Sequence, residues 1–341
     1  MGVENRDLWQ FGTLPKGEKN LVTDVPGVAV GHCTLQEGKI QTGVTAILPH
    51  GGNCFQSKCL AAAHVINGFG KSTGLVQVQE LGTLETPIVL TNTLSVGTAH
   101  TALVRYMLEG NPDIGVATGT VNPVVMECND GRLNDIRGLH IAEEHVRRAL
   151  HAAAADFEEG AVGAGTGMCC YGLKGGIGSA SRRMLLDGKS YTLGALVMSN
   201  FGALSDLMVA GQPLGREIAE RQKAESQPDR GSIIVVLATD LPLSSRQLGR
   251  VARRAQNGIA RTGTITGNGS GEIVLAFSTA NQVPHYPAGH TLAGAFLHED
   301  YMDHAFRAAV ECVEESIVSS LIHAEINPDT EGKIKSLSCW L

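Results

Sequence analysis

Short aliphatic runs alternate along this chain with stretches whose apolar residues recur at helical spacing, and this alternation most constrains the fold. Most of the runs are nearly continuous in Val, Ile, Leu and Ala, which is typical of strands covered on both faces. The predicted strands are residues 27–31, 43–48, 87–91, 191–199, 232–239 and 272–278. The pattern therefore predicts an α/β fold in which helices cover both sides of the sheets.

Three segments carry clear helix signals. Residues 141–155 place apolar side chains at helical spacing, and so does the chain from Met302 to Leu321. A third helix follows Ser244, because Ser244 and Gln247 form a capping box ahead of an apolar stripe.

Composition narrows the class of protein. The chain has 341 residues, of which 43% are hydrophobic, so it can bury a large core and is not disordered as a whole. The formal net charge of −7 argues against a nucleic-acid-binding protein, which usually has a basic surface. The polar stretch 221–231 is too short to require a domain boundary, so we expect one domain over residues 1–341.

The sequence shows no sign of secretion or membrane insertion. Its first twenty residues are charged and lack the apolar run of a signal peptide. The longest apolar run, 233–238, is far too short to cross a bilayer. The eight cysteines contain no C-x-x-C pair and are too sparse for a disulfide scaffold. We therefore expect a cytoplasmic protein.

Two segments only superficially resemble ligand-binding motifs. Residues 68–73 suggest a phosphate-binding loop, but Val65 occupies the position of a required glycine. His140 and His145 are five residues apart, so on a helix their rings would not share a face as a zinc site requires. No metal and no organic cofactor is predicted.

Glycine is concentrated in residues 160–178, where Tyr171 and Lys174 are the only long polar side chains. Such density indicates that backbone approaches backbone, or a ligand, very closely. Tight turns around a strand would also explain it, and the sequence does not decide between these interpretations.

The most specific feature is Gly269-Ser270, which leads from a Gly/Asn turn directly into an apolar strand. One interpretation is a plain hairpin turn. The other is a self-cleaving N-terminal nucleophile hydrolase, in which the Ser270 hydroxyl attacks the unhindered Gly269 carbonyl. Cleavage would leave Ser270 with a free α-amine of pKa near 7.7–8.0, which can act as general base for its own hydroxyl.

The sequence resembles the DmpA-like aminopeptidases, which include L-aminopeptidase/D-amidase-esterases and β-peptidyl aminopeptidases. The resemblance extends over residues 20 to about 325 in consistent order. It rests on blocks that include Thr23-Asp-Val-Pro-Gly-Val-x-Val-Gly31, Thr91-Asn-Thr-x-Ser-Val-Gly97, Gly165-Thr-Gly-Met-x-Cys-Tyr171, Asn268-Gly-Ser-Gly271 and Ala276-Phe-Ser-Thr-Ala-Asn281.

This resemblance implies a four-layer α/β/β/α sandwich similar to N-terminal nucleophile hydrolases. It also implies self-cleavage into an α chain, 1–269, and a β chain, 270–341, with Ser270 as nucleophile and Tyr171 nearby. The family's oxyanion asparagine should fall near Asp240, but an ionised carboxylate cannot donate a hydrogen bond. Asn200 is the alternative donor.

Further site residues are expected from the same resemblance. Cys312-x-Glu314 matches the family's Ser-x-Glu pair with cysteine in the serine position, and Glu159 matches an acid that meets the substrate ammonium group. Both acids could equally be ordinary exposed residues. The family tends toward tetramers of αβ units.

The implied function is a serine hydrolase that releases N-terminal residues from small peptides, amino-acid amides or esters. Two alternatives remain: an acyltransferase or oligoamide hydrolase on the related scaffold, and an unprocessed, non-catalytic ligand-binding homologue. Relatives with the first chemistry favour threonine as nucleophile, so Ser270 weighs against it.

Overall fold

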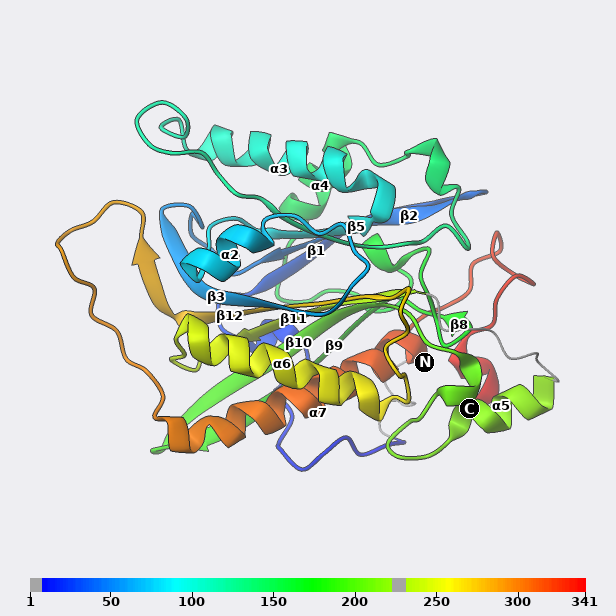
Figure 1. Cartoon of the computed structure of the whole chain (residues 1–341). Helices are drawn as coiled ribbons and strands as arrows, with labels where there is room; N and C mark the ends of the chain where they lie inside the picture. The colour runs from blue at the N-terminus through cyan, green and yellow to red at the C-terminus, as the bar shows by residue number, and fades with distance from the viewer. Residues whose placement is uncertain (1–7, 223–230) are drawn as a thin grey trace.

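Two sheets form the centre of the computed structural model, which describes residues 8–222 and 231–341 (Figure 1). The first sheet has the strand order β1-β2-β5-β6 and the second β4-β3-β12-β11-β10-β9. The strands of the first are β1 (Ala29–Glu37), β2 (Ile40–Leu48), β5 (Ile88–Asn92) and β6 (Val124–Cys128). Those of the second are β3 (Ser57–Gly68), β4 (Thr83–Leu84), β9 (Ile177–Leu186), β10 (Lys189–Asn200), β11 (Ser232–Thr239) and β12 (Gly271–Pro284). A small hairpin pairs β7 (Cys169–Cys170) with β8 (Leu173–Lys174).

Helices cover the outer face of each sheet. The helices are α2 (Leu75–Leu81), α3 (Val96–Gly110), α4 (Glu143–His151), α5 (Leu214–Gln222), α6 (Ser245–Arg261) and α7 (Met302–Ile322). Helices α3 and α4 pack on the four-stranded sheet, and α6 and α7 pack on the six-stranded sheet (Figure 1). A third apolar core, which includes Leu90 and Val236, lies between the two sheets. This order of layers confirms the predicted α/β/β/α sandwich.

The predicted elements agree with the structure where the sequence is most apolar. Strand β11 has the predicted bounds, and helices α6 and α7 begin where expected. Helix α4 is shorter than predicted, because the His145 ring accepts the Ala142 N–H at its start, and Ala154 pairs with Val30 beyond its end. Most of the predicted linker, 223–230, lies outside the described residues. None of the helices in the described part of the chain is long and apolar enough to cross a membrane.

Close packing explains part of the glycine-dense segment 160–178. A Cβ on Gly178 would lie 2.0 Å from the Ser316 carbonyl oxygen, so this glycine lets α7 approach β9. A Cβ on Gly176 would lie 2.0 Å from the Gly160 oxygen. Backbone-to-backbone contact, and not turns alone, therefore requires glycine here.

Lys174 ties the same segment together from inside. Its buried ammonium group donates hydrogen bonds to the carbonyl oxygens of Gly165, Met168 and Gly175, at 3.2, 2.9 and 2.7 Å. Burial lowers the pKa of this lysine to about 8. Because three acceptors match the three N–H donors of an ammonium group, Lys174 is an internal cross-link of the segment.

Strand register brings the predicted nucleophile and its neighbours to one end of the six-stranded sheet. Strands β11 and β12 are parallel, with Ser232 opposite Gly271. Strands β10 and β11 are antiparallel, with Asn200 opposite Ser232. Ser270, which immediately precedes β12, therefore lies at the same sheet end as Asn200 and Ser232.

Candidate active site

Ser270 is fully buried at the head of β12. Its hydroxyl donates a hydrogen bond to Glu272, with 3.1 Å between Oγ and Oε1. Glu272 is also fully buried, so this carboxylate meets the hydroxyl away from bulk solvent. A carboxylate that accepts the proton of a serine hydroxyl has the position of a general base.

Hydrogen bonds fix the loop that carries the Gly269–Ser270 bond. The Ser270 N–H donates to the Gly267 carbonyl at 2.9 Å. The Asn67 side-chain amide donates to the carbonyl oxygens of Gly267 and Asn268, at 3.3 and 3.2 Å, and also to that of Ser270. The chain is thereby held in one conformation on both sides of the predicted cleavage bond.

Thr266 in this loop adopts a left-handed backbone conformation with φ of 57°. A β-branched residue rarely does so, and the conformation costs free energy. The Thr266 hydroxyl donates to the other carboxylate oxygen of Glu272 at 2.8 Å, which holds the residue in place. Glu272 thus contacts both the strained loop and the nucleophile.

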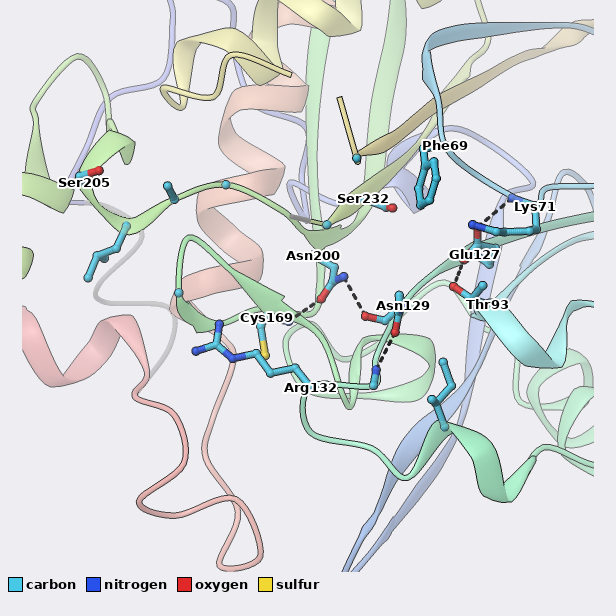
Figure 2. Close-up of a pocket in the computed structure, with 18 of the residues that line it drawn as sticks. Phe69, Lys71, Thr93, Glu127, Asn129, Arg132, Cys169, Asn200, Ser205 and Ser232 are labelled. Atoms are coloured by element: carbon cyan, nitrogen blue, oxygen red, sulfur yellow. Dashed lines mark hydrogen bonds between the residues drawn. The ribbon is translucent and has the colours of Figure 1, made fainter. Parts of the chain in front are cut away.

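A cavity of about 1090 Å³ lies in front of this sheet end (Figure 2). Gly269, Ser232 and Asn200 form part of its wall, so the predicted cleavage bond lies at the cavity surface. The charged side chains among the described residues that line it are Lys71, Glu127 and Arg132.

Asn200, the predicted oxyanion donor, ends β10 at this wall. Its Oδ1 accepts the Cys169 N–H at 2.9 Å, and its Nδ2 donates to the Asn129 carbonyl at 2.9 Å (Figure 2). An amide nitrogen carries two hydrogens, so the second remains for a ligand in the cavity. Asp240 follows β11 at the other end of that strand and accepts the Thr192 N–H, so it takes no part in the site.

Glu127 is an acidic residue of the cavity that the sequence did not point to. It lies on β6 and is 3% exposed. Its Oε1 accepts the Lys71 N–H at 2.9 Å, and its Oε2 accepts the Thr93 hydroxyl (Figure 2). Each carboxylate oxygen can accept a second hydrogen bond, so Glu127 can also bind a substrate ammonium group.

Tyr171 lies behind the cavity wall. It is fully buried, and its hydroxyl shares a hydrogen bond of 2.7 Å with the Thr262 hydroxyl. Gly202, a wall residue, packs on its ring so closely that a Cβ there would lie 2.4 Å from it. The tyrosine therefore shapes the wall through Gly202.

Glu314 does not line the cavity in the described part of the chain. It pairs with Arg261 at 3.0 Å, and burial raises the pKa of its carboxyl while Arg261 lowers it. The thiol of Cys312, two residues earlier on α7, donates to the Leu193 carbonyl at 3.3 Å. Leu193 is seven residues along β10 from Asn200, or about 23 Å in an extended strand. The structure does not bring Glu314 into the cavity.

The Glu159 side chain, too, makes its contacts outside the cavity lining. Its Oε1 accepts the Ser179 N–H at 2.6 Å and the Ser319 hydroxyl at 2.7 Å, so the carboxylate joins β9 to the end of α7. It does not line the cavity in the described part of the chain. Nor do residues 8–222 and 231–341 contain a cluster of three or more His, Cys, Asp or Glu that could hold a metal ion.

Known proteins are similar to this chain over nearly its whole length. The sequence pattern of peptidase family S58 matches residues 20–334. The beta-peptidyl aminopeptidase BapA of Sphingosinicella microcystinivorans is 40% identical over 97% of this chain and 88% of its own length.

Solved structures are also similar to this chain. The PH0078 protein of Pyrococcus horikoshii OT3 is 51% identical, with a TM-score of 0.90 over 95% of this chain and 92% of its own. The L-aminopeptidase D-Ala-esterase/amidase of Ochrobactrum anthropi, described as a prototype serine aminopeptidase with a variant of the Ntn hydrolase fold, is 40% identical. Its TM-score is 0.89 over 98% of this chain and 95% of its own.

Fold and site together define a peptidase built on this variant of the N-terminal nucleophile hydrolase fold. The chain belongs to peptidase family S58. The resemblance to DmpA-like aminopeptidases is thereby confirmed.

Proposed function

We propose that the chain cleaves itself between Gly269 and Ser270, and that the new N-terminal Ser270 then releases N-terminal residues from small peptides, amino-acid amides or esters. One observation carries this proposal. The buried Ser270 hydroxyl is hydrogen-bonded to the Glu272 carboxylate, directly beside a cleavage bond that lies in the wall of the large cavity.

Self-cleavage needs a base other than the α-amine, because that amine is still part of the Gly269–Ser270 amide. Glu272 accepts the hydroxyl proton while Ser270 Oγ attacks the Gly269 carbonyl carbon. The C–N bond then breaks, its nitrogen takes up the proton, and an ester remains. Water hydrolyses this ester, which leaves a Gly269 carboxylate and a Ser270 with free hydroxyl and amine.

In turnover, the freed α-amine takes the hydroxyl proton as Ser270 attacks the substrate carbonyl. The proton passes to the leaving amine or alcohol, and water later hydrolyses the acyl-enzyme. The second N–H of the Asn200 side chain stabilises the oxyanion. Glu127 binds the substrate ammonium group, which restricts the reaction to substrates with a free amine.

The relatives support the same substrate class. One is named as a beta-peptidyl aminopeptidase and another as an L-aminopeptidase and D-Ala esterase/amidase, so both names specify a residue with a free amino end. We extend this class to the present chain. A cytoplasmic location and a tetramer of αβ units remain predictions.

The mass of the purified protein tests the proposal. Wild type should give two fragments, 1–269 and 270–341, whose masses sum to the 35.9 kDa precursor plus one water. Ser270→Ala should remain one chain and lose hydrolysis of alanine p-nitroanilide. An intact wild-type chain that still hydrolyses this substrate would contradict the mechanism, and an intact, inactive one would favour the non-catalytic alternative.

A further inference from the structure

The cavity is electrically asymmetric. Figure 2 shows Glu127 on one side of Asn200, beside Thr93 and Lys71, and the Arg132 side chain reaching out on the other side, near Cys169. The site thus has the Glu127 carboxylate, with the Lys71 side chain beside it, at one end, the proposed oxyanion donor in the middle and a guanidinium group at the other end. The carboxylate and the guanidinium group complement the two charges of a zwitterion.

The Arg132 guanidinium group is available for a ligand. It comes from an exposed position in the loop after β6, and it forms no ion pair with an acidic residue of the described chain. Burial raises the pKa of the Cys169 thiol, and the positive charge of Arg132 opposes this rise. The charge of Arg132 therefore acts on Cys169, another residue of the cavity wall. Glu127 is the only carboxylate among the described residues that line the cavity, and it lies on the opposite side of Asn200.

We propose that Arg132 binds the free carboxylate of the substrate, so that the enzyme prefers unblocked di- and tripeptides over the corresponding amides. A guanidinium group binds a carboxylate through two parallel hydrogen bonds, which fixes both distance and orientation. With the ammonium group on Glu127, this contact places the first peptide bond beside Ser270 and Asn200. The inference rests on the proposed aminopeptidase function.

Hydrolysis of alanyl-alanine and of alanyl-alanine amide at pH 7 tests this role, because both α-amines are then mostly protonated. We expect wild-type kcat/KM to be roughly tenfold higher for the dipeptide, and the difference to lie in KM. Arg132→Gln should raise KM for the dipeptide by about the same factor and leave the amide unchanged. Arg137→Gln, an exposed substitution in the same loop, should preserve the wild-type preference.

Other outcomes overturn the proposal. Equal wild-type kcat/KM for dipeptide and amide, or an equal loss of both activities in Arg132→Gln, would show that Arg132 does not bind the carboxylate while the aminopeptidase function stands. If wild type hydrolyses neither compound nor alanine p-nitroanilide, the proposed function itself fails and the role of Arg132 fails with it. Unfolding midpoints of both variants should match wild type, which excludes a folding defect as the cause.

Discussion

The Ser270 hydroxyl and the Glu272 carboxylate form a fully buried hydrogen bond of 3.1 Å at the head of β12. Residues two apart in an extended strand project from the same face, so the strand itself aligns the two groups. Glu272 also accepts the hydroxyl of Thr266, at 2.8 Å, from the strained loop before the cleavage bond. The Glu272 carboxylate therefore positions both the Ser270 hydroxyl and the loop that carries the bond attacked by this hydroxyl.

Glu272→Gln tests the role of this carboxylate in self-cleavage. Glutamine keeps the size and one acceptor oxygen but is not a base, so we expect precursor cleavage to slow by roughly 100-fold or more. The measurement is the fraction of intact precursor against time on a denaturing gel. Glu272→Asp, which keeps the base at a greater distance, should be intermediate. Cleavage of the glutamine variant at the wild-type rate would exclude Glu272 as the base.

Gly269→Ala tests whether the carbonyl next to Ser270 must be unhindered. Apart from its two chain neighbours, no heavy atom of the described residues would lie within 4 Å of a Cβ at this position, and Gly269 does not adopt a left-handed conformation. Stability should therefore change by no more than about 0.5 kcal/mol. Cleavage should nevertheless slow severalfold, because the methyl group crowds the attacked carbon and restricts the loop.

Gly289→Ala is the matched control, because that glycine also has open space around it and lies in an exposed loop. This variant should be processed at the wild-type rate. If Gly269→Ala were processed equally fast, glycine would have no chemical role at the cleavage bond.

The sequence predicts the order of the helix and sheet layers better than it predicts some individual strands of the sheets. Continuous apolar runs, such as β11, are recognisable because both of their faces are buried. Strand β9 carries Arg182 and Arg183, and β3 is rich in alanine, so neither has that pattern. Both segments form strands because they pair with other strands of the six-stranded sheet. A local sequence pattern carries no information about such pairing.

The residues of the candidate site also differ in how well the sequence predicts them. Ser270 is recognisable locally, since a glycine-serine pair at the start of an apolar strand has a specific chemical meaning. Glu272 could have been found from its spacing of two residues from the nucleophile. Glu127 could not, because it reaches the cavity from the other sheet and only tertiary structure brings it close.

Glu127→Gln tests which acid binds the substrate ammonium group. The charge is lost, while the glutamine oxygen can still accept the Lys71 N–H and its NH2 group can donate to the Thr93 hydroxyl, so we expect KM for alanine p-nitroanilide to rise roughly tenfold or more. Glu159→Gln, at the acid expected from family resemblance, should leave KM unchanged. The reverse pattern in the two variants would assign the ammonium group to Glu159.

Asp130→Asn tests whether the buried Asp130 carboxyl makes the free energy of unfolding depend on pH. Burial raises the pKa of this carboxyl to about 6, so the folded state retains a proton that the unfolded chain loses near pH 4. The free energy of unfolding therefore falls as pH rises from about 4 to about 6. Asparagine can still accept the Asn134 hydrogen bond of 3.0 Å without the charge.

We expect Asp130→Asn to gain stability over the parent progressively across this range, up to about 3 kcal/mol above pH 7. Urea unfolding of the single-chain Ser270→Ala protein with and without the substitution measures this difference. A difference that stays constant from pH 4.5 to pH 8 would show that the carboxyl is not the titrating group.

Arg182→Met tests how the two predicted fragments stay together after cleavage. Arg182 is fully buried on β9 and pairs with Glu311 at 3.1 Å and Glu315 at 2.6 Å, both on α7. It also donates to the Phe11 carbonyl at 2.6 Å. Arg182 and Phe11 fall in the predicted α chain, while α7 falls in the β chain, so this cluster joins the products.

Methionine would leave two buried carboxylates without their main partner, which costs about 3–5 kcal/mol. We expect the unfolding midpoint of the processed protein to fall by roughly 6–15 °C, with easier separation of the fragments in dilute urea. The exposed neighbouring substitution Arg183→Met should have little effect, because the Arg183 side chain forms a single hydrogen bond within the described residues, to the Lys16 carbonyl at 3.0 Å. If both variants lost stability equally, fragment association would not depend on the buried charges.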